Sequence, residues 1–176
     1  MKYTIFKPEE HLAEKGVKNW TKKEATEYFN WFLKVKDKRV DEFLKFFDIS
    51  LSNQFDLDLN LISKKLFQHL TENREFTDQL ENGRLVLNKY GYSVIGDFGL
   101  LLSKNFETKY TKLKWVIGGK PKSYHSYNLP VLEGFENGEW DFIFTSIQKF
   151  GYAMNHINEP YDWSGFYNEL IDKIKT

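Results

Sequence analysis

Apolar residues recur three or four positions apart along most of the chain, and this spacing predicts helices. The clearest run begins at 21–24, Thr-Lys-Lys-Glu, which matches a capping box in which the Thr hydroxyl and the Glu carboxylate satisfy backbone N–H groups reciprocally. Apolar positions continue at helical spacing to Val35, and a second run covers 40–47. We place a break near Asp37, which could cap the second helix; one bent helix of the same extent is the alternative.

The same periodicity predicts five further helices, over 59–70, 72–80, 97–112, 143–154 and 164–174. An Asn-Gly pair at 82–83 would follow the end of the second of these. Asp97 would cap the third, because an Asp side chain at an N-cap accepts backbone N–H groups. Asp162 or Ser164 would cap the last.

Two segments have the pattern of strands rather than helices. Residues 113–117 alternate, include β-branched side chains and end at two glycines, and 131–135 is the expected partner strand. Residues 2–7 fit a short edge strand, whereas 85–95 is ambiguous between a strand and an extended loop. The predicted fold class is therefore α+β, mainly α: a single compact domain over 1–176 with about seven helices and a small minor β-sheet.

The composition agrees with one globular domain. The 176 residues have the length of a single domain, and aromatic residues make up 18% of them, enough for a substantial core. The absence of cysteine excludes thiol catalysis and zinc–thiolate sites. No stretch of 18 uncharged apolar residues occurs, and the first 20 residues lack the apolar core of a signal peptide. We therefore expect a cytoplasmic protein with no membrane partner.

No catalytic, metal-binding or cofactor-binding motif is found. None of the four histidines has the spacing of a metal site. The loop at 118–123 lacks the earlier glycine and the Ser or Thr of a phosphate-binding loop, and the segment 91–96 is one residue too long for a nucleophile elbow. We predict no catalytic residues, no metal and no cofactor from these patterns.

The net charge of zero conceals a basic segment followed by an acidic one. Residues 101–132 hold six lysines and one acidic residue, whereas 133–176 hold eight acidic residues and three lysines. Carboxylates steer a basic partner and aromatic rings anchor it, so an acidic aromatic surface is typical of protein binding. The predicted partner-binding residues are Glu133, Glu136, Glu139, Trp140, Asp141, Glu159, Tyr161 and Asp162. The alternative is that the two charged segments face each other, or that the acids lie in solvated loops while the aromatics enter the core.

The same composition argues against nucleic acid as a partner. Only three arginines accompany 22 lysines, and arginine supplies the bidentate contacts that phosphates and guanine edges favour. The acidic final quarter would also repel a phosphate backbone.

Four segments carry a resemblance to a known group of proteins. They are 20–32, which holds the capping box with Tyr28-Phe29 and Trp31-Phe32, then 93–102 (SVIGDFGLLL), 113–115 (LKW) and 128–135 (NLPVLEGF). In these segments the chain resembles small bacterial proteins, some of which are grouped with the immunity proteins of polymorphic-toxin systems. The resemblance implies a cytoplasmic, non-enzymatic protein that neutralises a cognate toxin. It transfers no site residue, because immunity proteins bind through variable surfaces.

Two functional hypotheses follow. The first is a protein-binding domain, specifically an immunity protein whose partner is a basic toxin domain. The second is a small hydrolase or transferase with a site assembled from distant residues, for which Ser93, Asp97, Tyr124 and His125 are the first candidates. Convergence of those four side chains on one pocket would favour the second hypothesis.

Overall fold

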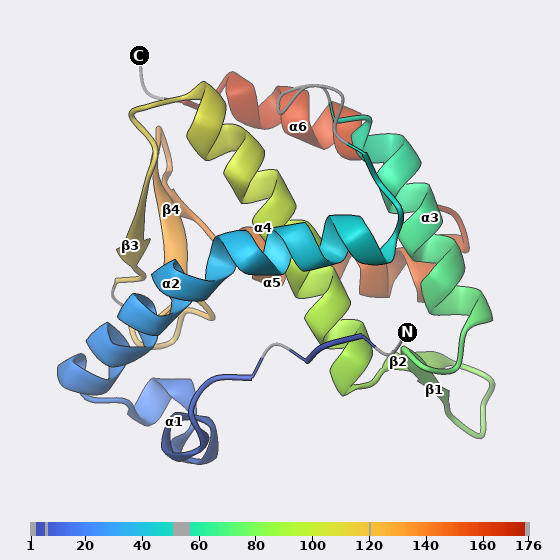
Figure 1. The fold of residues 1–176 in the computed structure, drawn as a ribbon, viewed down its shortest axis with the longest axis horizontal. Coiled ribbons are helices and arrows are strands. Elements are labelled where there is room, and N and C mark those ends of the chain that lie inside the picture. Colours follow the sequence, from blue (N-terminus) through green and yellow to red (C-terminus); the bar gives the residue numbers. More distant parts are fainter. Residues whose placement is uncertain (1–2, 6, 51–56, 120, 175–176) are drawn as a thin grey trace.

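A long central helix, α4 (Lys89–Lys109), organises the molecule (Figure 1). Two other helices, α2 (Lys22–Phe46) and α5 (Phe142–Tyr152), both pack against it. The computed structural model describes residues 3–5, 7–50, 57–119 and 121–174. Within them the fold is α+β and mainly α, as the hydrophobic pattern predicts.

Helix α2 confirms the predicted capping box and corrects the predicted break. The Thr21 hydroxyl accepts the backbone N–H of Glu24, and the Glu24 carboxylate accepts the backbone N–H of Thr21. The helix then runs without interruption past Asp37, so the alternative of one continuous helix is correct. Asp37 is exposed and its carboxylate lies 3.3 Å from Lys104 Nζ of α4. Arg39 and Val40, which follow Asp37 in α2, are buried, so the packed face of the helix continues past Asp37. This packing outweighs the weak helix propensity of a single Asp.

The region after α3 (Leu59–Glu72) differs from its prediction. Helix α3 confirms the helix predicted over 59–70, with Asp58 as a cap that was not predicted, but the helix expected over 72–80 is absent. Instead β1 (Thr77–Gln79) and β2 (Leu85–Leu87) form an antiparallel hairpin. The Asn-Gly pair at 82–83 lies in its turn, where Gly83 has φ +82°, a backbone conformation typical of hairpin turns.

The start of α4 also differs from its prediction. Asn88 is the N-cap and accepts the backbone N–H groups of Tyr90 and Gly91, so the helix begins eight residues before Asp97. Asp97 therefore lies inside the helix, fully buried, and does not cap it. Glycines weaken a helix prediction, yet here they permit close packing. A Cβ on Gly99 would lie 2.7 Å from the Phe142 carbonyl oxygen at the start of α5.

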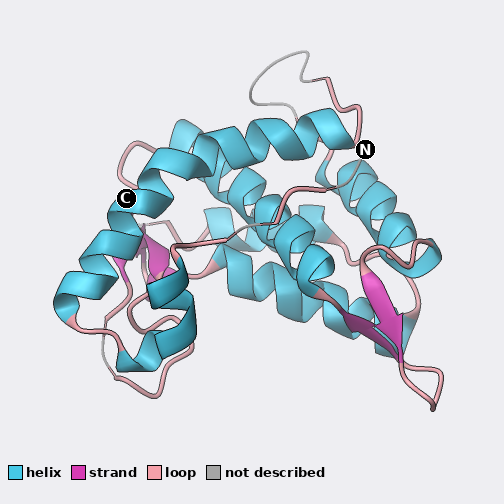
Figure 2. Ribbon diagram, turned by 60° about the horizontal axis from the view of Figure 1, so that its bottom comes forward, coloured by secondary structure: helices cyan, strands magenta, loops and turns pink. Residues whose placement is uncertain are grey.

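The second sheet is antiparallel in the order β3 (Lys114–Ile117), β4 (Pro130–Phe135) and β5 (Gly138–Trp140). The first two strands are the predicted pair, whereas β5 was not predicted. The two sheets lie at opposite ends of the helical layer (Figure 1 and Figure 2). The edge strand expected over 2–7 is not seen in its described residues, 3–5 and 7. These residues form an extended segment that lies beside the helices.

The remaining elements complete one main core. Helix α6 (Trp163–Ile171), capped by Asp162, packs against α3, and the short helix η2 (Ala153–Ile157) continues α5. One cluster of buried side chains runs from Tyr3 to Leu170. A smaller cluster holds α1 (Glu10–Lys15) and η1 (Val17–Asn19) against the start of α2. Six α-helices are present among the described residues, against about seven predicted, and none of them could span a lipid bilayer.

Candidate functional site

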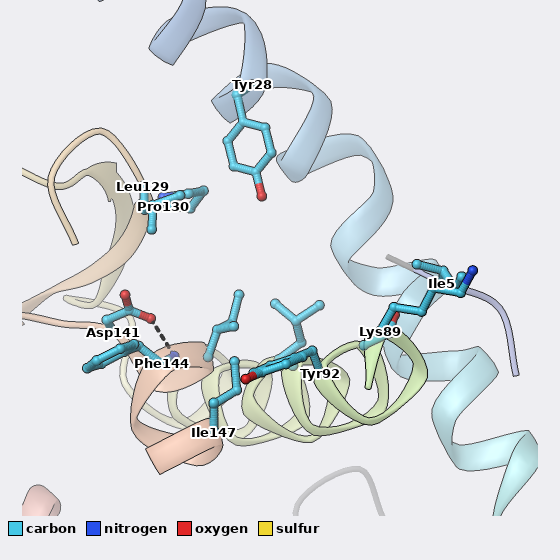
Figure 3. Close-up of a pocket in the computed structure, with 13 residues that line it drawn as sticks. Ile5, Tyr28, Lys89, Tyr92, Leu129, Pro130, Asp141, Phe144 and Ile147 are labelled. Carbon is cyan, nitrogen blue, oxygen red and sulfur yellow. Dashed lines mark hydrogen bonds between the residues drawn. The ribbon is translucent and has the colours of Figure 1, made fainter. Parts of the chain in front are cut away.

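A pocket of about 460 Å³ lies between α2, α4 and the start of α5 (Figure 3). Most of its wall is apolar, including Leu100 of α4 and both Ile143 and Ile147 of α5. Its volume falls in the range of pockets that hold small organic ligands. The pocket is therefore large enough for a ligand and has walls suited to an apolar one.

Local sequence explains why the pocket forms where it does. Gly96 contributes no side chain to the α4 face that lines the pocket, and a Cβ at this position would lie 3.6 Å from Ile143 Cγ2. Gly99, one turn later on a neighbouring face, lets the first residues of α5 approach the α4 backbone. This approach brings the α5 N-terminus, and with it Asp141, to the pocket wall.

Asp141 is the buried acid of the pocket. Its side chain caps α5, with Oδ1 accepting the Phe144 backbone N–H at 2.9 Å, and only 8% of the residue is exposed. Burial raises the pKa of Asp141 above the usual aspartate value, although the helix N–H groups and His125 oppose that rise. Its Oδ2 lies 4.0 Å from His125 Nε2, and no Lys or Arg nitrogen among the described residues pairs with it. His125 is itself half-exposed, with its ring stacked on Phe144.

Tyr28 of α2 faces the same pocket. Its side chain points into the cavity in Figure 3, and the residue is 8% exposed. None of the described residues forms a hydrogen bond with its hydroxyl. Burial, and secondarily the charge of Asp141, raise the pKa of Tyr28, so the hydroxyl stays protonated. The Tyr28 hydroxyl and the Asp141 carboxylate are therefore two polar groups at a mainly apolar pocket.

A second buried aspartate, Asp97, is fully paired on an adjacent face of α4. Its carboxylate accepts hydrogen bonds from the guanidinium of Arg39 and, at 2.5 Å, from the Tyr3 hydroxyl. Arg39 also donates to Glu42 and to the Thr4 carbonyl, at 2.9 and 2.8 Å. Burial raises the pKa of Asp97 to about 6, while Arg39 and Tyr3 act in the opposite direction. This network ties the N-terminal segment to α2 and α4.

The residues suspected of catalysis do not share one set of contacts, although Ser93 lines the pocket as well as joining the Asp97 network. Ser93 and Asp97 both bond Arg39, and Ser93 also donates to the Thr4 carbonyl. His125 instead contacts Asp141 and Phe144, and Tyr124 is exposed in the loop before β4. The contacts of the described residues therefore do not unite the four side chains in one catalytic group.

Several of the predicted partner-binding acids have local roles. Glu133 faces Lys114 across the β3–β4 ladder, with the charged groups 3.6 Å apart. Glu139 accepts hydrogen bonds from the Gly119 backbone and the Ser126 hydroxyl, both at 3.3 Å. Asp162 caps α6 and Asp141 caps α5.

The aromatic members of that predicted surface do come together. The rings of Trp140 and Tyr161 both contact Phe166, with centroids 6.0 and 6.4 Å away. The Lys149 ammonium lies 4.6 Å from the Tyr161 ring centre. Glu136 and Glu159 are exposed. The structure thus gathers part of the predicted surface around Phe166 and places Asp141 in the pocket instead.

An exposed group of possible metal ligands was not indicated by sequence spacing. Glu9, His11 and Glu27 bring one ligand atom each within 4.8 Å of one another. His11 lies 3.2 Å from Glu27 and 3.7 Å from Glu9, so two ion pairs explain the grouping and we assign no metal to it.

The pocket itself was also missed from the sequence, because Tyr28 and Asp141 are more than a hundred positions apart. The one local signal was Asp141, an Asp directly before a helical run, which was interpreted as part of an acidic surface. In comparisons with known proteins, no family model, no curated protein and no solved structure matches the chain. Function is therefore inferred from the geometry of the pocket and its surroundings.

Proposed function

We propose that this protein binds a small, mainly apolar molecule in the pocket between α2, α4 and α5. The observation that carries the proposal is an apolar cavity of about 460 Å³ that the buried Asp141 lines and into which the Tyr28 hydroxyl points. The apolar wall favours an apolar body, which displaces water from the cavity. The Tyr28 hydroxyl and the Asp141 carboxylate are the polar groups that such a ligand could bond.

A pocket-filling variant tests the proposal. The side chain of Gly96→Leu would extend into the cavity, and its Cβ would meet only Ile143 Cγ2, at an ordinary 3.6 Å. The probe is N-phenyl-1-naphthylamine, an uncharged dye at neutral pH whose fluorescence rises in apolar surroundings. We expect the wild-type protein to bind the dye and Gly96→Leu to bind it at least about tenfold more weakly, since the added side chain occupies the ligand volume.

Gly151→Leu is the matched control. Gly151 also lies in a helix, nothing lies within 4 Å of a Cβ placed there, and it does not line the pocket. This variant should keep wild-type dye binding, and both variants should keep the helical circular dichroism of the wild type. Absence of dye binding to the wild type, or equal binding by Gly96→Leu, would overturn the proposal.

Protein binding is the second candidate function, and it includes the immunity role that the sequence resemblance implies. Support comes from the row Trp140–Phe166–Tyr161 and from the negative charge of the exposed Glu136 and Glu159, which lie four positions before Trp140 and two before Tyr161 in the sequence. Acidic and aromatic groups together suit a basic partner. The neutralised toxin and the cytoplasmic location remain predictions, as does the hydrolase or transferase alternative.

A defined partner tests this second candidate. A purified basic toxin domain encoded beside this protein should form a one-to-one complex in size-exclusion chromatography at physiological salt. Replacing Glu136 and Glu159 with lysine should weaken the complex, whereas the same change at Glu10 and Glu14, which are exposed on α1, should not. An unaffected complex would place the interface elsewhere.

A further inference from the structure

Asp141 is a buried carboxylate whose countercharge is incomplete. Its Oδ1 is used by the α5 cap, while Oδ2 has His125 as its nearest cation, at 4.0 Å. The half-exposed His125 side chain carries a charge only when protonated. Glu139 of β5 adds further negative charge nearby. A buried carboxylate is costly unless it is paired, so this wall of the pocket favours a cation.

The remaining groups around the pocket suit the same kind of ligand. Tyr28 and Phe144 present aromatic rings on either side of the Asp141 region (Figure 3). Aromatic faces attract ammonium groups, and a tyrosine hydroxyl can accept a hydrogen bond from one. Lys89, the only Lys or Arg among the described lining residues, lies at the far end of the pocket from Asp141.

The geometry points to a protonated amine as the polar group of the ligand, paired with the Asp141 carboxylate while an apolar body occupies the space along Ile143 and Ile147. This inference rests on the proposed ligand-binding function and adds the chemical class of the ligand. An anionic ligand placed in the same way would meet a carboxylate of like charge and is disfavoured.

A series of three compounds of similar shape tests the inference by calorimetric titration at pH 8. The compounds are 2-phenylethylamine, 2-phenylethanol and 3-phenylpropionate, which are cationic, neutral and anionic. We expect the amine to bind at least about tenfold more tightly than the alcohol, and the anion to bind most weakly, because only the amine completes the charge of Asp141.

Asp141→Asn isolates the charge from the fold. Asn caps helices about as well as Asp, so α5 should keep its cap while the negative charge is lost. The preference for the amine should disappear, and the affinity for 2-phenylethanol should change by less than about twofold. Asp162→Asn is the matched control, since Asp162 caps α6 in the same way outside the pocket, and it should keep the preference. If Asp141→Asn fails to fold, Asp141→Ser replaces it, because Ser also caps.

The outcomes separate this inference from the function on which it rests. Binding of the alcohol and of the uncharged dye without a preference for the amine would overturn the amine assignment and leave the pocket's function standing. A preference for the anion, or an amine preference that survives in Asp141→Asn, would also overturn it. Failure of all three compounds and of the dye to bind would overturn both.

Discussion

Asp97 and Asp141 are two buried acids in the same protein, and their carboxylates differ in the partners that the fold supplies. Asp97 is fully buried, and its carboxylate is satisfied by the guanidinium of Arg39 and the hydroxyl of Tyr3. Asp141 is 8% exposed and lines a pocket, and its Oδ2 has only His125, 4.0 Å away, as a cationic neighbour among the described residues. Both carboxyl groups have raised pKa values, and in both cases burial is the largest cause.

The difference in partners distinguishes a structural role for Asp97 from the ligand-binding role proposed for Asp141. A buried acid with its partners supplied from within the protein connects segments of the fold. A buried acid that faces a cavity without a full partner costs stability that the fold alone does not recover, and a ligand can recover it. Burial or pKa shift alone would not distinguish the two sites; the partners do.

The largest expected effect comes from removing the partner of Asp97. Arg39→Met should destabilise the protein by about 3–5 kcal/mol, because it leaves a carboxylate buried without its cation. Urea unfolding followed by circular dichroism measures the loss. The triple variant Arg39→Met, Asp97→Leu and Tyr3→Phe should recover most of it, because a buried ion pair can be replaced by apolar residues at little cost once the Tyr3 hydroxyl, which would lose its acceptor, is also removed. A loss below about 1 kcal/mol in the single variant would contradict the role assigned to this pair.

A smaller loss is expected from the second partner of Asp97. Tyr3→Phe should cost about 1.5–3 kcal/mol, the range for a hydrogen bond to a charged group, because Tyr3 donates to the Asp97 carboxylate at 2.5 Å. Unfolding in urea again measures it. A wild-type midpoint would show that Arg39 alone satisfies the carboxylate.

The pH dependence of amine binding tests the role assigned to the Asp141 carboxylate. Burial raises the pKa of Asp141, so in the folded protein the Asp141 carboxyl group stays protonated at pH values where a free aspartate is ionised. Only the carboxylate attracts an ammonium, so affinity should fall by up to about tenfold per pH unit below that raised pKa. The charge of Glu139 adds to the rise in the Asp141 pKa and so moves the loss of amine affinity to higher pH. A charged His125 lowers that pKa but competes with the amine for the carboxylate.

Calorimetric titration of 2-phenylethylamine from pH 8 down to pH 3.8, the ordinary aspartate value, measures this trend. Asp141→Asn should show a flat profile, because it has no carboxyl proton to exchange at this position. A wild-type affinity that does not change with pH would argue against a contact between the amine and Asp141.

The smallest expected effect on stability is that of Tyr28→Phe. The Tyr28 hydroxyl has no partner among the described residues, so its removal should change the unfolding free energy by less than about 0.5 kcal/mol. The contrast with Tyr3→Phe, the same chemical change at another buried tyrosine, is the informative quantity. A loss comparable to that of Tyr3→Phe would indicate a structural partner for the Tyr28 hydroxyl.

Local signals in the sequence predicted much of the secondary structure. The capping box at Thr21 and Glu24 and the strand pair formed by β3 and β4 were predicted because they depend on neighbouring residues or on simple alternation. Asp97 was misassigned for the same reason. An Asp beside glycines fits a helix cap locally, and only the distant Arg39 and Tyr3 show that it is a buried ion-pair partner.

The sequence by itself determined the fold class, most of the helices and the caps at Thr21 and Asp162, because those depend on periodicity and on contacts within one turn. The tertiary structure alone decided what the acids do. It brought Arg39 to Asp97 over 58 positions and placed Tyr28 and Asp141 on one pocket, although they lie more than a hundred positions apart. Such pairings follow from how whole helices pack, and here from the close approach of α5 to α4 at Gly99. No pattern local to the chain specifies them.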